Sequence, residues 1–186
     1  MKTTTTRWFK GWLPRWGLVT ALAIGAAASI GWMNQRQYQL GGGWIGNNGA
    51  GNIWNALQIP LDSAGRTAAL RIHLPIYNPE FAGLLAALGA DAATDAVGEV
   101  KMVGRNTANY RTVFYLHAQG NPPTLRAIAV NAGTVTYTGP DNIEVAYTID
   151  VYLPGADADA DGLPDPGSVP IISIPGLDTA KRVPAL

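Results

Sequence analysis

The chain has 186 residues, of which 47% are hydrophobic and 14% are charged, so it can fold around one core of ordinary size. It contains no cysteine, which excludes disulfide bonds, thiolate nucleophiles and cysteine-ligated metal sites. The formal net charge is zero and no cluster of lysine and arginine follows residue 28, so we do not expect nucleic-acid binding.

Residues 1–28 have the layout of a signal peptide or a signal anchor. The basic residues of this segment are Lys2, Arg7, Lys10 and Arg15. They precede the uncharged run 16–33, and the small residues 26–28 predict cleavage before Ser29. Without cleavage, residues 16–33 would anchor the chain in a membrane. We therefore predict an exported protein, located in the periplasm, at the cell surface or outside the cell. Beyond residue 28 the chain holds nine basic and 13 acidic residues.

The rest of the chain divides into three parts. Residues 29–52 are rich in glycine and asparagine, which predicts a flexible linker. Residues 53–153 hold alternating apolar runs and form the predicted β-rich domain. Residues 154–186 form an acidic loop and a proline-rich tail.

Two alternating runs at the start of the β-rich domain, 53–61 and 67–76, predict a β-hairpin, with turn residues at 62–65. The apolar residues of the first run that fall on one face are Ile53, Leu57, Ile59 and Leu61. The residues of the second run that we expect to face inward are Leu70, Ile72, Leu74 and Ile76.

A change of period after the hairpin predicts one helix over residues 79–88. Asn78 suits the N-cap and Pro79 the first helical position, and Gly89 suits the C-terminal end. Apolar residues recur at helical spacing at Phe81, Leu84, Leu85 and Leu88.

The remaining alternating runs predict further strands at 97–105, 110–118, 125–137 and 143–153. We expect a bulge at Gly133, and the turn residues at 139–142 predict that the last two strands pair as a hairpin. The predicted fold is mainly β, with six to seven antiparallel strands and one helix. A barrel, a sandwich and a curved sheet are all compatible with this pattern.

Residues 157–165 read D-A-D-A-D-G-L-P-D. Over these nine residues the chain resembles the calcium-binding loops of EF-hands and of thrombospondin type 3 repeats. The resemblance implies one structural calcium ion. The implied ligands are Asp157, Asp159, Asp161, the carbonyl of Leu163, and Asp165. Ser168 stands where an EF-hand has a bidentate glutamate, and proline and glycine flank the loop, so paired EF-hand helices are excluded. The alternative is a solvated acidic linker.

Two glycine-rich patterns overlap near residue 42. Gly41–Gly46 matches G-x-G-x-x-G, but no predicted strand precedes it and no helix follows, so we do not expect a dinucleotide site. Gly42-Gly43-Trp44 resembles the G-x-W signature that opens the first strand of lipocalins. That resemblance implies a barrel that encloses an apolar ligand.

Sequence motifs for catalysis are weak. His73 and His117 are the only histidines, and two histidines without a carboxylate fall short of a catalytic zinc site. None of the serines lies in a G-x-S-x-G motif. The helix and the strands also resemble the NTF2-like fold, in which a curved sheet forms a pocket. That resemblance implies acid–base roles for His73 or His117 and for Tyr77.

From the sequence we therefore favour an exported, non-enzymatic, β-rich component of the cell surface, envelope or matrix that is stabilised by one calcium ion. A lipocalin-like binder of a small apolar ligand is the first alternative, and an NTF2-like enzyme is the second. Calcium is the one cofactor that the sequence suggests, and no protein partner is indicated.

Overall fold

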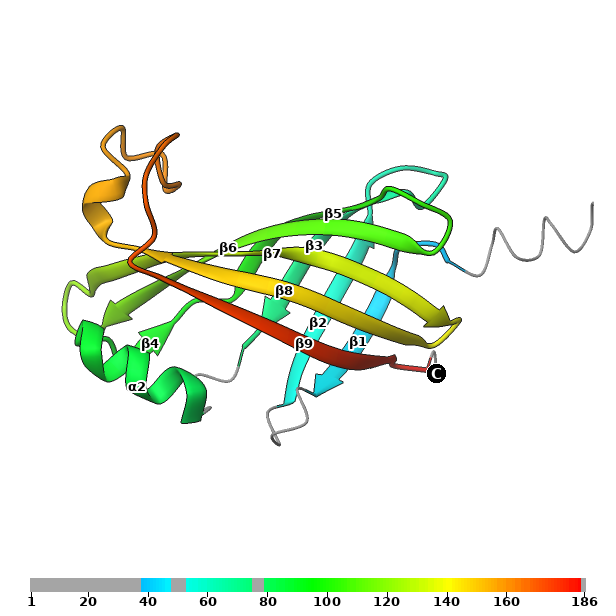
Figure 1. Ribbon diagram of the computed structural model, residues 1–186, viewed down its shortest axis with the longest axis horizontal. Helices are drawn as coiled ribbons and strands as arrows, with labels where there is room; N and C mark the ends of the chain where they lie inside the picture. Colours follow the sequence, from blue (N-terminus) through cyan, green and yellow to red (C-terminus); the bar gives the residue numbers. More distant parts are fainter. Residues whose placement is uncertain (1–37, 48–52, 75–78, 185–186) are drawn as a thin grey trace, which may run out of the picture. The chain divides into compact units, whose positions relative to one another are not determined.

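The computed structural model describes residues 38–47, 53–74 and 79–184, and Figure 1 shows that they form a β-barrel with one α-helix. The elements in chain order are β1 (Gly42–Asn47), β2 (Ile53–Pro60), β3 (Thr67–His73), α2 (Pro79–Leu88), β4 (Ala92–Ala93), β5 (Ala96–Met102), β6 (Thr107–Ala118), β7 (Thr124–Gly139), β8 (Asn142–Tyr152), the 3-10 turn η1 (Pro154–Ala156) and β9 (Ile172–Arg182). The predicted signal or anchor segment lies outside the described residues. Within the described part, no helix is long and apolar enough to cross a membrane.

All nine strands belong to one antiparallel sheet. Apart from the two-residue β4, which pairs with β6, each strand pairs with its neighbours in sequence, and β9 pairs back onto β1. The result is a closed up-and-down barrel. This confirms a mainly β fold with one helix and selects the barrel from the three predicted architectures. It also corrects the predicted number of six to seven strands.

The two missed strands of the barrel lie in segments that the sequence pattern assigned to a linker and a tail, and the two-residue β4 was missed as well. β1 lies within residues 29–52 and has the sequence GGWIGN, while β9 lies within residues 154–186 and contains both proline and glycine. Glycine and proline disfavour a strand locally. Both segments nevertheless form strands, because pairing on both sides satisfies their backbone groups in the closed barrel.

The helix and both hairpins agree with the sequence-based predictions. α2 covers residues 79–88 as predicted and ends at Gly89, which has the left-handed φ of +63°. β2 pairs with β3, and β7 pairs with β8. In the β2–β3 turn, Asp62 accepts hydrogen bonds from the backbone N–H of Arg66 and Thr67, and the bond from Arg66 lowers the pKa of the Asp62 carboxyl.

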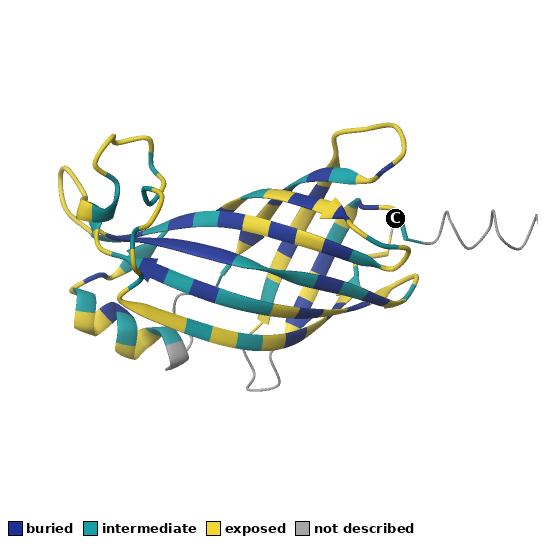
Figure 2. Cartoon of the chain, turned by 45° about the horizontal axis from the view of Figure 1, so that its top comes forward, coloured by how far each residue is buried: buried dark blue, intermediate teal, exposed yellow. Residues whose placement is uncertain are grey.

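Buried and exposed residues alternate along most of the barrel strands, so every second side chain points into the interior (Figure 2). β7 departs from this pattern, since residues 127–131 are all buried. In β2 the apolar face is the outer one: Leu57 and Ile59 are exposed, whereas Ala56 and Gln58 are buried. The register with β3 explains this orientation, because it places Gln58 opposite the buried Leu70. Alternation alone identifies two faces of a strand but does not say which one is inside.

Gly133 does not form the predicted bulge. It pairs regularly with β6 and β8, and the register shifts occur at Leu116/His117 and Tyr137/Gly139. A Cβ at Gly133 would overlap the Ala146 carbonyl oxygen of β8. The missing side chain therefore permits a close approach of two strands in the curved wall.

Aromatic side chains fill the end of the barrel where the chain enters β1. Tyr137 makes edge-to-face contacts with Tyr38 and Trp44, with ring centroids 5.4 Å and 5.9 Å apart. The Arg182 guanidinium lies 4.6 Å from the Trp44 ring centroid, and its Nη1 donates to the Gly41 carbonyl at 2.8 Å. The last strand is thereby held to the segment that precedes the first one.

The helix α2 and the acidic loop between β8 and β9 lie at the opposite end of the barrel (Figure 1). Phe81 of α2 packs on the buried Phe114 of β6, with ring centroids 6.4 Å apart. Leu85 is buried, and Leu84 and Leu88 pack on the same core. The apolar face that the sequence predicted for this helix thus packs on the end of the barrel.

Replacement of Gly133 by alanine should destabilise the protein by about 1–3 kcal/mol, because a Cβ at this position forces two strand backbones apart. Urea denaturation followed by circular dichroism measures this change. The matched control is Gly83→Ala in α2, where nothing lies within 4 Å of the added Cβ. It should stabilise the protein by roughly 0.5–1 kcal/mol. Unchanged stability in Gly133→Ala would contradict the close approach.

Candidate functional site: the barrel cavity and the acidic loop

The barrel interior contains a partly open cavity of about 70 Å³. Its wall is mostly apolar and includes Ala56, Leu70, Ile72, Leu74, Phe81 and Ile149. One water molecule needs roughly 10–15 Å³ of such space, so the cavity admits several water-sized groups. It extends from Trp44, at the aromatic end, to Phe81 of α2.

A buried carboxylate, Asp178 of β9, lies in this wall. Its residue is 6% exposed. Trp54 Nε1 donates to Asp178 Oδ2 at 2.5 Å, and the Tyr147 hydroxyl donates to Oδ1 at 3.4 Å. Trp54 lies in β2 and Tyr147 lies in β8. These two strands are on opposite sides of β9 in the sheet, so the carboxylate accepts a hydrogen bond from each side of its own strand.

Two glycines make this arrangement possible. Gly46 of β1 lies opposite Trp54 in the register, and a Cβ at Gly46 would overlap the indole ring. Gly176 of β9 lies opposite Tyr147, and a Cβ there would overlap the phenol ring. Each ring therefore lies across a strand that has no side chain beneath it, which lets both rings reach Asp178.

A second polar group in the wall belongs to β6 and β7. The Tyr110 hydroxyl donates to Asn131 Oδ1 at 2.9 Å. Burial raises the pKa of the Tyr110 hydroxyl, the charges of Tyr147 and Asp178 act in the same direction, and the bond to Asn131 opposes them. Tyr110 thus stays a neutral hydrogen-bond donor throughout the physiological pH range.

The aromatic end contains a tyrosine with a similarly high pKa. Burial raises the pKa of Tyr137 to about 12, while the Arg182 charge and the nearby Gln58 side chain oppose the shift. Gln58 Oε1 accepts the backbone N–H of Gly41 at 3.1 Å. Among the described residues, the Tyr137 hydroxyl has no hydrogen-bond partner of acceptable geometry, although Gln58 is close enough to affect its pKa.

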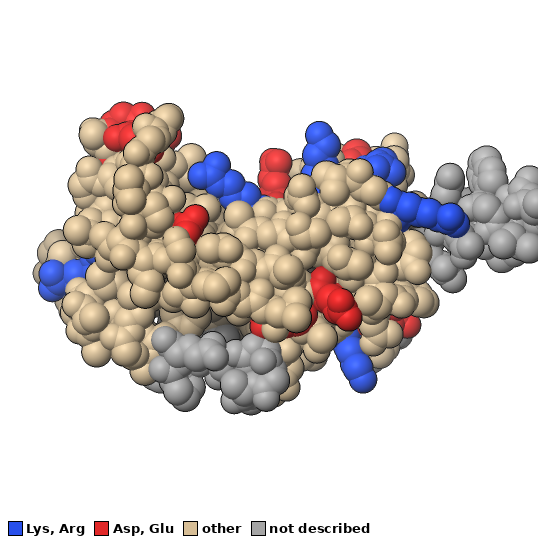
Figure 3. All heavy atoms as spheres, in the orientation of Figure 1, with Lys and Arg blue, Asp and Glu red and all other residues tan. Residues whose placement is uncertain are grey.

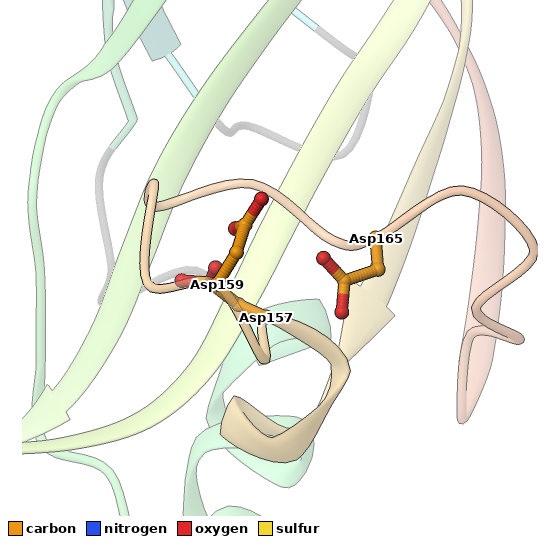
Figure 4. A group of neighbouring side chains, drawn as sticks. All are labelled: Asp157, Asp159 and Asp165. Carbon is orange, nitrogen blue, oxygen red and sulfur yellow. The ribbon is translucent and has the colours of Figure 1, made fainter.

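Three of the predicted calcium ligands lie together in the acidic loop between β8 and β9. One carboxylate oxygen each of Asp157, Asp159 and Asp165 lies within 4.8 Å of the other two (Figure 4). Figure 3 shows a group of acidic side chains on this loop, whereas the other acidic and basic side chains are scattered singly over the barrel face. Such a group of oxygens has the chemistry that hard cations prefer.

Asp161 is not a member of this group of three carboxylates. Its Oδ1 accepts the backbone N–H of Leu163 at 2.8 Å. The Leu163 carbonyl stays a predicted ligand. The turn itself relies on Gly162, whose φ is +88° and whose N–H donates to Asp157 at 3.0 Å. The Tyr115 hydroxyl of β6 donates to the Gly162 carbonyl at 3.1 Å, so the loop is held against the barrel wall.

The histidines singled out in the sequence do not line the cavity. His73 points outward from β3, and its Nδ1 lies 2.8 Å from Asp95 Oδ1. His73 and the neighbouring Arg71 hold the pKa of the Asp95 carboxyl below its usual value. His117 lies in the part of β6 that pairs with β4, and Tyr77 lies outside the described residues. The residues proposed for acid–base chemistry are therefore not brought together among the described part of the chain.

Sequence reasoning missed Asp178 and its two donors. Asp178 lies in the strand that was assigned to the tail, so its inward position could not be assigned. The alternation of Ile174, Gly176, Asp178 and Ala180 along one face was the available signal. An acid in such a series indicates either a solvated face or a polar interior site, and only the strand pairing distinguishes the two.

Comparison of the chain with protein-family models, with curated proteins and with solved structures finds no match. The functional argument therefore depends on the geometry of the cavity and of the acidic loop.

The high pKa of Tyr137 predicts a loss of stability in alkali. Tyrosine in an unfolded chain has a pKa near 10. Because the pKa in the folded state is higher, the stabilisation is complete below pH 10 and is lost as the pH rises towards about 12. Between pH 9 and 11.5 we expect a loss of about 2 kcal/mol from this residue.

Urea denaturation across this pH range should show a shallower decline for Tyr137→Phe than for the wild type. Tyr152→Phe, at the end of β8, is the matched control and should follow the wild type. If the free energy of unfolding falls equally with pH in Tyr137→Phe and in the wild type, the high pKa assigned to Tyr137 is contradicted.

Proposed function

We propose that the protein is a lipocalin-like binder of a small, largely apolar ligand in the barrel interior. The observation that carries the proposal is the cavity of about 70 Å³ with mostly apolar walls inside a closed barrel. Trp44, from the segment that resembles the lipocalin signature, lies in β1 and lines this cavity. The cavity favours binding over a purely structural role in the envelope or matrix.

The difference between the two ends of the barrel supports entry of the ligand into the cavity at the end where α2 lies. The aromatic end is filled by Tyr38, Trp44 and Tyr137 and is tied together by Arg182. At the other end the cavity is lined by Leu74 and by Phe81 of α2. Because a single short helix can move more easily than paired strands, the ligand enters beside α2.

An NTF2-like enzyme receives less support. That alternative needs acid–base side chains that converge in the pocket, whereas His73 lies on the outer surface. The basic and apolar N-terminal segment supports the further proposal that binding takes place after export. The protein is then either released or held at the membrane by residues 16–33.

A cavity-filling substitution tests the proposed function. Ala56 is buried and lines the cavity, so Ala56→Leu should reduce the affinity for the probe 1-hexanol at least tenfold. Isothermal titration calorimetry measures this affinity. Ala69→Leu places the same side chain on the outer face of β3 and should bind the probe like the wild type. Binding that persists in Ala56→Leu, or that is absent from the wild type, would contradict the proposal.

We also propose that the acidic loop binds one structural calcium ion. The supporting observation is the convergence of the Asp157, Asp159 and Asp165 carboxylates, which repel one another unless a cation neutralises them. A bound ion would stabilise the connection between β8 and β9. This proposal concerns stability, and the cavity proposal does not depend on it.

Calcium should raise the melting temperature of the protein saturably. With a dissociation constant of about 0.1 to 1 mM, 10 mM calcium should stabilise it by about 1–3 kcal/mol, or roughly 3–10 °C, relative to EGTA. Asp159→Asn should abolish this rise. Asp161→Asn tests the ligand set, because Asp161 lies outside the group of three carboxylates. Asp141→Asn, in the turn at the opposite end of the barrel, is the control and should keep the full rise. A rise that persists in Asp159→Asn would place the ion elsewhere.

A further inference from the structure

We propose that the ligand of the barrel cavity carries a neutral carbonyl group, as a small ketone or aldehyde does, and that its oxygen accepts a hydrogen bond from the side-chain amide of Asn131. This inference rests on the proposed ligand-binding function and specifies its ligand class. It starts from a buried amide in a mostly apolar wall, because Asn131 of β7 lines the cavity and is 4% exposed.

Only one half of this amide is used within the protein. Asn131 Oδ1 accepts a hydrogen bond from the Tyr110 hydroxyl at 2.9 Å. Asn131 Nδ2 has no hydrogen-bond partner in the part of the chain that the structure describes, yet packed atoms do not close it off as they close off Trp44 Nε1. Because Asn131 is almost fully buried and lines the cavity, the open space that Nδ2 faces is the cavity.

Two side chains of β6 hold Asn131 in place. Tyr110 binds the amide oxygen, and Thr112, which lies opposite Asn131 in the register, donates from Oγ1 to the Asn131 backbone carbonyl at 3.3 Å. Burial raises the pKa of the Tyr110 hydroxyl, so this group keeps its proton at neutral pH. With the oxygen held by Tyr110, the two N–H donors of the planar amide are left for a ligand.

A free amide in an apolar wall selects for a ligand with a hydrogen-bond acceptor. A ligand that displaces water from Nδ2 must replace its hydrogen bond, since a buried N–H without an acceptor costs free energy. A hydrocarbon offers no acceptor. A carbonyl oxygen has two lone pairs and can accept from Nδ2 while the rest of the ligand packs on the apolar wall.

The charge of the lining favours a neutral acceptor. The described lining contains no lysine, arginine or histidine, so a carboxylate ligand would lose its hydration without gaining an opposite charge. An ammonium ligand has only donors and cannot accept from Nδ2. An alcohol offers an oxygen but also brings an O–H donor, which needs an acceptor in turn. A neutral carbonyl group therefore fits the amide best.

The strand pairing places the rest of the ligand. Ile149 of β8 lies opposite Asn131 in the register and lines the cavity beside it. Leu74 and Phe81 continue the apolar lining to α2. A short alkyl group attached to the carbonyl carbon can extend along these side chains. The volume of about 70 Å³ limits the part of the ligand inside the cavity to a few heavy atoms.

Two probes of the same shape test the inference: 2-pentanone, and 2-methyl-1-pentene, in which a CH₂ group replaces the carbonyl oxygen. Isothermal titration calorimetry at pH 7 gives both affinities for the full chain and for Asn131→Leu, which has nearly the same shape and lacks the amide. In the variant we expect the ketone affinity to fall at least tenfold and the alkene affinity not to fall. Comparison of the two proteins cancels the difference in hydration between the probes.

A ketone affinity that stays unchanged in Asn131→Leu, or falls by the same factor as the alkene affinity, overturns the inference and leaves the proposed function standing. The same holds if the alkene or 1-hexanol binds the wild type and the ketone does not. If none of the three binds, the proposed function fails as well. Asn109→Leu, on the outer face of β6, is the matched control. It should leave both affinities unchanged, and a similar loss of ketone affinity there overturns the assignment to Asn131.

If Asn131→Leu does not fold, the infrared spectrum of 2-pentanone bound to the wild-type chain replaces it. A hydrogen bond to the carbonyl oxygen weakens the C=O bond. The stretching band of the bound ketone should therefore lie at a lower wavenumber than that of the ketone dissolved in hexane. A band at the same position as in hexane overturns the inference.

Discussion

The pairing of β9 with β1 is the constraint on which the rest of this structure depends. It converts an antiparallel meander into a closed barrel, so that no strand of the barrel is left with an unpaired edge. Side-chain contacts stabilise the pairing of β9 with β1 at two places along the strands. Arg182 of β9 packs on Trp44 of β1, and the bond from Trp54 to Asp178 crosses from β2 over β1 to β9. Without closure, the cavity would be an open groove and Asp178 would lie in water.

Closure also explains why the strands at the seam are rich in small residues. Gly46 and Gly176 each leave room for a ring from the adjacent strand, and both rings donate to Asp178. The same residues weaken the local preference for a strand. The barrel thus contains residues of low β-strand propensity at the positions that form its polar interior site. Such local exceptions are typical of functional sites.

The two proposed sites lie on different parts of one scaffold. The cavity is formed by inward side chains of paired strands and extends to the helix α2. The acidic loop lies outside the wall at the same end and is attached to it through the bond from Tyr115 to the Gly162 carbonyl. An ion in the loop would stabilise the junction of β8 with β9, and hence the strand that carries Asp178.

The sequence by itself determined the elements whose pattern is local: the helix at 79–88, the hairpins around residues 62–65 and 139–142, and the acidic loop with its turn at Gly162. Only the tertiary structure decided which face of each strand is inside, as the exposed Leu57 shows. It also decided that GGWIGN and the last eleven-residue strand close the barrel, and that Asp178 is buried. The physical reason is that helices and turns form from contacts between near neighbours, whereas a strand depends on partners far away in sequence.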